Sequence, residues 1–396
     1  MRIAGIIAEY DPFHNGHAAH IAATRRDGGA THVVTVISGS MTQRGEPATF
    51  TKFQRTAMAL QGGADLVLEL PVPWSMASAQ RFAEGGVSIL HALGCVDLLS
   101  FGSECGDIQR LKQLASLQDT EEYARHLHLA LEAGLPYAAA RQRAARVVAE
   151  DDAALLDTPN NTLGLEYLRA STNSGANWET FTLARQGTLH HENSVKSGFA
   201  SGSLLREMVN NKQVEDIINL VPTTSMKVIK EAIARGLAPA DRTKAHTPIL
   251  MQLRRMGVDD LAQLPYVSEG LENRLYKASR TAVSYDKLIE GVKTRRYPLT
   301  RIRRMLWAAL LGMEQNTLPN LPLYLRVLGM NARGREILSA AAPTLPLLTR
   351  TAQLENMSSQ AQHVFRLEAT ATDLHALLLP NPQPCGNDYT QKLVSL

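Results

Sequence analysis

Residues 1–101 alternate short apolar segments with stretches of helical pattern. The segments that have the pattern of strands are 3–8, 32–37, 65–70 and 97–101. The helical patterns between them cover 15–26, 50–60 and 77–93. Short apolar strands separated by helices of this length are typical of βαβ units, whose strands lie parallel in one sheet with both faces covered. The sequence therefore predicts an α/β domain built on a parallel sheet.

The remainder of the chain is mostly helical in pattern. From about residue 107 to 150 the sequence is rich in Ala, Leu and Arg, which indicates a helical insertion. A weak strand pattern returns at 178–183 and a helical one at 201–210, and beyond 211 almost every segment looks helical. We therefore expect an α/β domain over 1–210, interrupted by the insertion, and a mainly α-helical domain over 211–396.

Composition places the chain among soluble globular proteins, since 44% of its 396 residues are hydrophobic and 20% are charged. No apolar run reaches the roughly 18 residues of a transmembrane helix. Cys95, Cys105 and Cys385 are too few and too scattered for a disulfide framework, and no Cys-x-x-Cys pair indicates zinc. We expect a protein of the reducing cytoplasm, with no membrane partner and no metal held by the chain alone.

The four residues His14-Asn15-Gly16-His17 lie between the first predicted strand and the first predicted helix. A glycine lets the backbone approach a ligand closely, and the free N–H groups of a helix N-terminus attract phosphate. Two His side chains three residues apart share one face of the first turn, so both can donate hydrogen bonds to phosphate oxygens in a transition state. We therefore expect His14 and His17 to be catalytic in nucleotidyl transfer. The alternatives are a polar loop, or zinc, which lacks a third ligand at useful spacing.

A second element lies at residues 200–206, with the sequence Ala-Ser-Gly-Ser-Leu-Leu-Arg. Ser201 and Ser203 open a predicted helix, and Arg206 follows one turn later. On the residues alone, the segment is equally a simple serine N-cap, whereas the resemblance named next implies hydroxyl groups, a helix N-terminus and an arginine that bind a triphosphate. The segment is similar to the Ile-Ser-Ser-Thr-x-x-Arg signature of the HIGH-motif nucleotidyltransferase superfamily. Its place downstream of the paired histidines favours the nucleotide-binding interpretation.

Seven blocks of the sequence, in order, resemble one bacterial family. They are residues 6–20, 37–48, 63–71, 101–104, 159–170, 268–275 and 293–304. The family is that of the tRNA(Met) cytidine acetate ligases, which activate acetate with ATP and acetylate the wobble cytidine of elongator methionine tRNA. The resemblance implies a Rossmann-like HIGH-type nucleotidyltransferase domain, a site for ATP with Mg²⁺, and acetate and elongator tRNA(Met) as partners rather than DNA. It also implies two steps, through acetyl-adenylate to N4-acetylcytidine.

By this resemblance the ATP site draws on several parts of the chain. Its implied residues are Ile7, Ala8, Glu9, Tyr10, Phe13, His14, Asn15, Gly16, His17, His20, Gly102, Asn160, Asn161, Arg185, Ser201, Ser203 and Arg206. From the residues alone, Gly102 is equally well a turn glycine, and Asn160 and Asn161 either bind the nucleotide or cap a helix. We place Asn160 slightly ahead of Asn161. Arg185 either neutralises phosphate or is solvated.

The sequence departs from the family pattern at Asp11, where an asparagine is expected. An extra carboxylate there either weakens triphosphate binding by repulsion or helps to hold a magnesium ion. Glu9, Gln43, Arg44 and Glu46 lie on loops at the same predicted edge of the sheet. They form either a second tier of the site or a structural loop.

The predicted RNA-binding segment is 274–304, which contains ten Lys and Arg residues against two acids, with tyrosines between them. Basic residues hold phosphates, and aromatic rings stack on unpaired bases. The residues assigned to RNA are Lys293, Arg295, Arg296, Arg301, Arg303 and Arg304. The alternative is a solvated helical face, or arginines that pack the helical domain onto the catalytic one.

Two other functions compete with the ligase. One is an adenylyltransferase of coenzyme metabolism that joins a phosphorylated small molecule to AMP. The other is a non-catalytic RNA-binding protein that retains a nucleotide pocket. The basic helical segment argues against the first, and the presence of His14, Gly16, His17 and Arg206 argues against the second.

Overall fold

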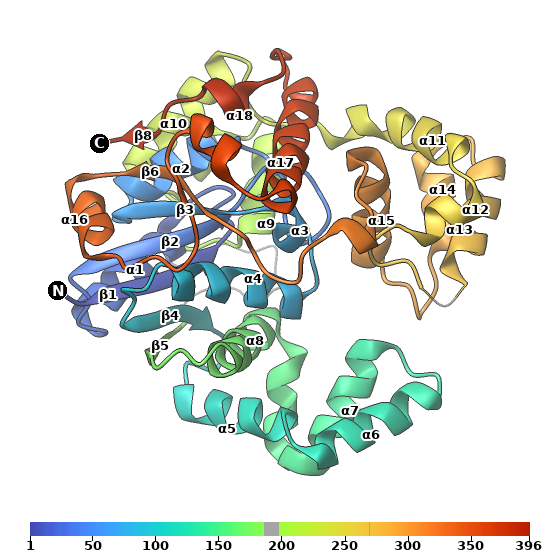
Figure 1. Ribbon diagram of the computed structural model, residues 1–396, viewed down its shortest axis with the longest axis horizontal. Helices are drawn as coiled ribbons and strands as arrows, with labels where there is room; N and C mark the ends of the chain where they lie inside the picture. Colours follow the sequence, from blue (N-terminus) through green and yellow to red (C-terminus); the bar gives the residue numbers. More distant parts are fainter. Residues whose placement is uncertain (186–197, 269) are drawn as a thin grey trace.

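The computed structural model describes residues 1–185, 198–268 and 270–396, and its centre is one β-sheet (Figure 1). The strand order is β5-β4-β1-β2-β3-β6-β7, and β8 pairs with β6. The strands are β1 (Ile3–Ala8), β2 (His32–Ser38), β3 (Leu66–Leu70), β4 (Leu98–Ser103), β5 (Glu179–Ala184), β6 (Leu325–Met330), β7 (Leu347–Leu348) and β8 (Val394–Ser395).

Strands β1 to β5 pair in parallel, which confirms the predicted α/β class. The chain runs from β1 outward through β2 and β3, then crosses to β4 on the other side of β1. In such a sheet ligands bind beyond the carboxyl ends of the strands where the order reverses. A ligand site is therefore expected at the segments that follow β1 and β4.

Helices cover both faces of the sheet. On one face Ile6, Val33 and Val67 pack with α1 (Asn15–Arg26) and α2 (Lys52–Gln61). On the other face Ile3 and Leu66 pack with α4 (Ala79–Ala92) and α8 (Pro159–Asn173). Both sides of each central strand are therefore buried, which explains why these strands are continuous apolar runs in the sequence.

Two groups of helices project from the sheet domain (Figure 1). The insertion forms α5 (Ile108–Gln118), α6 (Glu121–Glu132) and α7 (Tyr137–Ala149), as the pattern over 107–150 predicts. The second group, called the helical lobe here, comprises α11 (His246–Arg255), α12 (Val258–Ala262), α13 (Leu271–Thr281), α14 (Tyr285–Val292) and α15 (Leu299–Leu311). The chain also forms α3 (Val72–Ser75), α9 (Gly202–Asn210) and α10 (Thr223–Ala234), and α10 packs on α2.

The last part of the chain returns to the sheet, which the sequence analysis did not anticipate. Strand β6 pairs antiparallel with β3, so the residues after 211 are not a purely helical unit. The helices α16 (Ala332–Ala340), α17 (Ser359–Leu378) and α18 (Asn387–Thr390) accompany it. A six-residue apolar run such as Leu325–Met330 cannot be told from a piece of buried helix by its pattern. The boundary near 210 stays a prediction.

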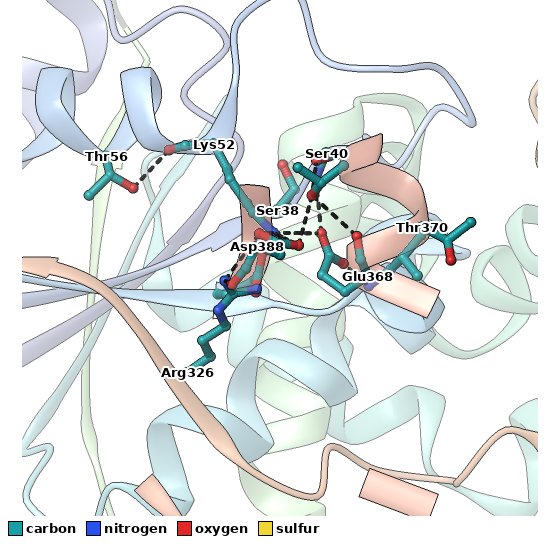
Figure 2. A network of polar contacts seen from close by, with 12 residues as sticks. Ser38, Ser40, Lys52, Thr56, Arg326, Glu368, Thr370 and Asp388 are labelled. Carbon is teal, nitrogen blue, oxygen red and sulfur yellow. Dashed lines mark hydrogen bonds and ion pairs between the residues drawn. The ribbon is translucent and has the colours of Figure 1, made fainter. Parts of the chain in front are cut away.

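A buried ionic network attaches this returning segment to the sheet (Figure 2). The ammonium of Lys52 lies 2.6 Å from Glu69, 3.2 Å from Glu368 and 2.8 Å from Asp388. Arg326 of β6 lies 2.9 Å from Glu69 and 3.1 Å from Asp388. Charges this deep in a protein are tolerated only when they are paired, so each of the segments holds the others in place. Within the described parts of the chain, no helix is both long and apolar enough to cross a membrane.

Candidate functional site

The paired histidines open helix α1 directly after the β1 loop. His14 is the N-cap residue, and its Nδ1 accepts the backbone N–H of Gly16 at 3.0 Å. The Nδ1 of His17 accepts the backbone N–H of His14 at 3.2 Å. The two rings are stacked, with centroids 3.7 Å apart. Because each Nδ1 is an acceptor, the hydrogen bonds assign the proton of each neutral ring to Nε2, so both side chains present an N–H donor.

Burial keeps these rings uncharged. Burial, with smaller contributions from Arg185 and Arg206, lowers the pKa of His14 to about 3. Burial, followed by the charges of His14 and Arg185, lowers the pKa of His17 well below its usual value. His20, whose Nε2 lies 2.9 Å from the Ser100 hydroxyl, has its pKa lowered to about 4 by burial. At neutral pH all three are therefore neutral hydrogen-bonding groups rather than cations.

Gly16 is required by the position of the His14 ring. A Cβ atom on Gly16 would lie 2.9 Å from Cε1 and 3.1 Å from Nδ1 of His14. Real Cβ atoms essentially never make a contact under 3.0 Å, so any side chain at this position would displace the ring. The glycine of the motif therefore leaves room for the His14 ring.

Two aromatic side chains pack against the His17 ring. The ring centroid of Tyr10 lies 4.7 Å from that of His17, and the ring of Phe13 lies 5.5 Å away. Tyr10 is fully buried and has a φ of 53°, a left-handed conformation that a bulky residue adopts only where its surroundings impose it. The predicted site residues Tyr10 and Phe13 therefore contact the ring of His17.

The second predicted element lies beside this loop. Ser201 is the N-cap of α9 and accepts the N–H of Leu204 at 3.2 Å, and its hydroxyl lies 3.0 Å from that of Ser203. Arg206 donates to the backbone carbonyl of Asp11 at 2.8 Å. The structure therefore places residues 201–206 beside the histidine loop, although the two segments are nearly two hundred residues apart in the sequence. Ser201 caps α9 in the same position.

The segment after β4 forms the other side of the site. The carboxylate of Glu104 accepts the backbone N–H groups of Asn160 and Asn161 at the start of α8, at 3.2 and 2.7 Å. The Oδ1 of Asn161, a buried residue, accepts the N–H groups of Glu104 and Cys105. The Oδ1 of Asn160 instead accepts a hydrogen bond from Arg185 at 3.0 Å. The side-chain amide of Asn160 also donates to Glu104 at 2.6 Å, so both asparagines support the loop, and Asn160 is the less buried of the two.

Other predicted ATP-site residues have structural roles. The side-chain amide of Asn15 donates to the carbonyls of Gly198 and Asn219. Ile7 lies in the core beneath α4, and Ala8 is half-buried at the end of β1. A Cβ on Gly102 would make an ordinary contact, 3.5 Å from Cγ of Arg185, so this glycine leaves room at the end of β4 without being sterically required.

Asp11, where the sequence departs from the family pattern, supports a neighbouring loop. It is buried, and its two carboxylate oxygens accept the backbone N–H groups of Thr49 and Phe50 at 2.8 and 3.1 Å. These two hydrogen bonds join the Asp11 carboxylate to the loop that precedes α2. Among the described residues, no group of three or more His, Cys, Asp or Glu side chains is placed to hold a metal.

The cations assigned to RNA fall into two groups. Arg301 donates to the carbonyl of Tyr266 and the hydroxyl of Ser268, Arg303 pairs with Glu46 at 2.8 Å, and Arg304 donates to the carbonyl of Gln43 at 2.8 Å. Arg303 and Arg304 thus pack the helical lobe onto the loop 41–47. The exposed members of the set are Lys293, Arg295 and Arg296.

Sequence reasoning missed Arg55, which organises the edge of the sheet. This buried guanidinium donates to the carbonyls of Glu9 at 2.8 Å and Ser38 at 2.9 Å, and also to the carbonyl of Gly39. It thereby joins the ends of β1 and β2. Its partners are backbone atoms remote in sequence, so no local pattern could have indicated the role.

The comparisons agree with this geometry. The profile of the HIGH Nucleotidyl Transferase family matches residues 1–391. The chain is 35% identical over 413 residues to the tRNA(Met) cytidine acetate ligase of Acetivibrio thermocellus, with 100% of both chains covered. It is 39% identical over 402 residues to that of Syntrophotalea carbinolica, covering 96% of this chain and 95% of the relative. Among solved structures, Thermotoga maritima TmcAL bound with alpha-thio ATP is similar with a TM-score of 0.92, 30% identity and 100% coverage of both chains. The chain therefore belongs to the tRNA(Met) cytidine acetate ligase family, within the HIGH nucleotidyltransferases.

Proposed function

We propose that this protein joins acetate to the N4 amine of the wobble cytidine of elongator tRNA(Met), with ATP converted to AMP and pyrophosphate. The observation that carries the proposal is the pair of Nε2–H donors of His14 and His17 at the start of α1, with Arg185 and Arg206 beside them. The names of full-length relatives support the choice of substrates.

In the first step a carboxylate oxygen of acetate attacks the α-phosphorus of ATP, and the bond from that phosphorus to the bridging oxygen of pyrophosphate breaks. His14 and His17 donate hydrogen bonds to the phosphate oxygens as their charge grows. Two neutral donors held by the backbone need no reorganisation during the reaction. Arg185 and Arg206 supply positive charge, and the N-terminus of α1 adds its dipole. Ser201 and Ser203 lie with Arg206 on the triphosphate side of the site.

Magnesium would enter this site with the phosphates of ATP and would neutralise part of their charge, which is how this ion is usually held in phosphoryl-transfer sites. The donor set agrees with that mode, because the carboxylates of Asp11 and Glu104 accept backbone N–H groups.

We assign tRNA binding to the helical lobe. The exposed cations Lys293, Arg295 and Arg296 precede α15, and α15 contacts the loop 41–47 at the edge of the sheet. A bound tRNA would thus extend from the lobe toward the carboxyl ends of the strands. A tRNA-modifying role also agrees with the cytoplasmic location that the cysteine content predicts.

The test is the incubation of unmodified elongator tRNA(Met) with protein, ATP, Mg²⁺ and labelled acetate, followed by mass spectrometry of the nucleosides. Labelled N4-acetylcytidine is expected with the parent protein and not with His17→Ala. His128→Ala is the matched control, because His128 is an exposed residue of α6. Pyrophosphate exchange that requires a phosphomonoester instead of acetate would replace the proposal with the small-molecule adenylyltransferase. Binding of tRNA without ATP turnover would indicate a non-catalytic RNA-binding protein.

A further inference from the structure

Acetyl transfer to cytidine needs a proton acceptor, because the N4 amine loses a proton as it forms the amide. The paired histidines cannot supply one. In both rings Nδ1 already accepts a backbone N–H and Nε2 carries the proton. A ring in this state donates hydrogen bonds but has no free lone pair in the plane of the ring. A protein base for this step must therefore be a group other than His14 and His17.

Most carboxylates near the site are committed to other partners. Both oxygens of Asp11 accept backbone N–H groups. Both oxygens of Glu104 accept N–H groups at the start of α8. The Oε1 of Glu46 lies 2.8 Å from Arg242 and 2.8 Å from Arg303. Proton transfer to any of these three would break contacts that hold a loop or a helix.

Glu9 differs from the other carboxylates. It is half-buried at the end of β1, five residues before His14. Its Oε1 accepts the backbone N–H of Gln43 at 2.7 Å, which fixes the direction of the side chain. Within residues 1–185, 198–268 and 270–396, its other oxygen has no hydrogen-bond or ion-pair partner. One oxygen thus orients the carboxylate, and the second is available.

The position of Glu9 also suits the tRNA. The loop that holds it packs on the helical lobe, since the carbonyl of Gln43 accepts a hydrogen bond from Arg304. Gly45 of the same loop, with a φ of 72°, approaches α15 so closely that a Cβ would lie 2.6 Å from the backbone nitrogen of Arg304. Through Gln43, Glu9 thus connects the segment that leads to His14 and His17 with the loop on which the helical lobe packs.

We propose that Glu9 receives the N4 amine of the wobble cytidine and takes its proton in the second step. This inference rests on the function proposed above. The N4 nitrogen attacks the acetyl carbon of acetyl-adenylate, the bond between that carbon and the phosphate oxygen breaks, AMP leaves, and one N4 proton moves to the free oxygen of Glu9. A carboxylate is also the group that recognises the N4 amine of cytosine, so the same oxygen selects cytidine over uridine.

The variant that tests this proposal is Glu9→Gln. Its amide oxygen can still accept the N–H of Gln43, so the loop is retained and only the basic oxygen is lost. Two rates are measured, namely the single-turnover transfer of labelled acetyl to tRNA, and acetate-dependent pyrophosphate exchange in the presence of a tRNA with uridine at the wobble position. A positioned general base contributes about 10²–10⁴-fold, so transfer should fall at least on the order of 100-fold more than exchange. Glu9→Asp, which keeps a carboxylate, should recover part of the transfer rate.

Equal losses in both rates would overturn the proposal, because Glu9 would then act in adenylation or in the fold. Unchanged transfer would overturn it as well. Thermal unfolding midpoints of the two variants within a few degrees of the parent exclude a folding defect. Failure of the underlying function looks different, since the parent protein itself would then exchange pyrophosphate without acetylating tRNA.

Discussion

Replacement of Gly16 by alanine should separate the stability of the protein from its catalysis. The added Cβ would lie 2.9 Å from Cε1 of His14, whereas ordinary contacts begin near 3.4 Å. The ring must therefore shift by about 0.5 Å or more, and the hydrogen bond from the Gly16 N–H to Nδ1 must lengthen from 3.0 Å. Because the His17 ring is stacked on the His14 ring, a shift of the His14 ring should displace the Nε2–H donors of both residues.

The two effects have different magnitudes. Alanine improves the helix by about 1 kcal/mol relative to glycine, and the weakened hydrogen bond costs about 0.5–1.5 kcal/mol, so the free energy of unfolding should change by less than about 1 kcal/mol. A displacement of catalytic groups by about 1 Å can cost on the order of 100-fold. For half that shift we expect kcat to fall by roughly 10- to 100-fold, which is about 1.4–2.7 kcal/mol in activation free energy.

The assay is steady-state formation of N4-acetylcytidine together with thermal unfolding of the same preparations. Gly257→Ala is the matched control, because its Cβ would make only an ordinary contact, 3.6 Å from Asp260 at the start of α12. A Gly16→Ala protein with kcat within twofold of the parent would refute the reasoning, since it would show that the ring positions do not matter.

Other predictions concern stability and RNA. Lys52→Met leaves three carboxylates without their ammonium and should cost about 3–5 kcal/mol in urea unfolding. Burial lowers the folded-state pKa of His375 to about 4, below its usual 6.5, so the unfolded state binds the proton first as pH falls. The free energy of unfolding should therefore decrease, by up to about 3 kcal/mol, as pH falls from 6.5 toward 4. His375→Gln should reduce this dependence of the unfolding free energy on pH. Lys293→Gln with Arg295→Gln should weaken tRNA binding and lower the slope of log Kd against log salt by up to about 0.7–0.9 per charge, whereas an unchanged slope would place the RNA elsewhere.

The sequence predicted the elements that carry local signals. Strand β1 and helix α1 have the bounds expected from the pattern, because an apolar run and a helical period flank a polar loop. What it missed depends on contacts between distant segments. The segment Leu325–Met330 forms a strand because it pairs with β3 at the edge of the sheet. Arg55 stabilises the ends of β1 and β2 because it donates hydrogen bonds to the carbonyls of Glu9 and Ser38. The basic segment 293–304 was visible as composition, but only the structure separates exposed Lys293 from Arg304, which joins two parts of the protein.

The spacing of the histidine motif explains why the sequence alone indicated a candidate site there. His14 occupies the N-cap and His17 the third position of the helix, which are the two positions of a capping box. In an ordinary capping box these side chains only satisfy backbone N–H groups. An imidazole does this with one nitrogen and keeps a second, protonated nitrogen on the far side of the ring, so the cap that starts the helix also fixes the tautomer and direction of two hydrogen-bond donors. The same two side chains therefore start the helix and present two N–H donors, which is why a four-residue pattern between a strand and a helix contains so much of the candidate site.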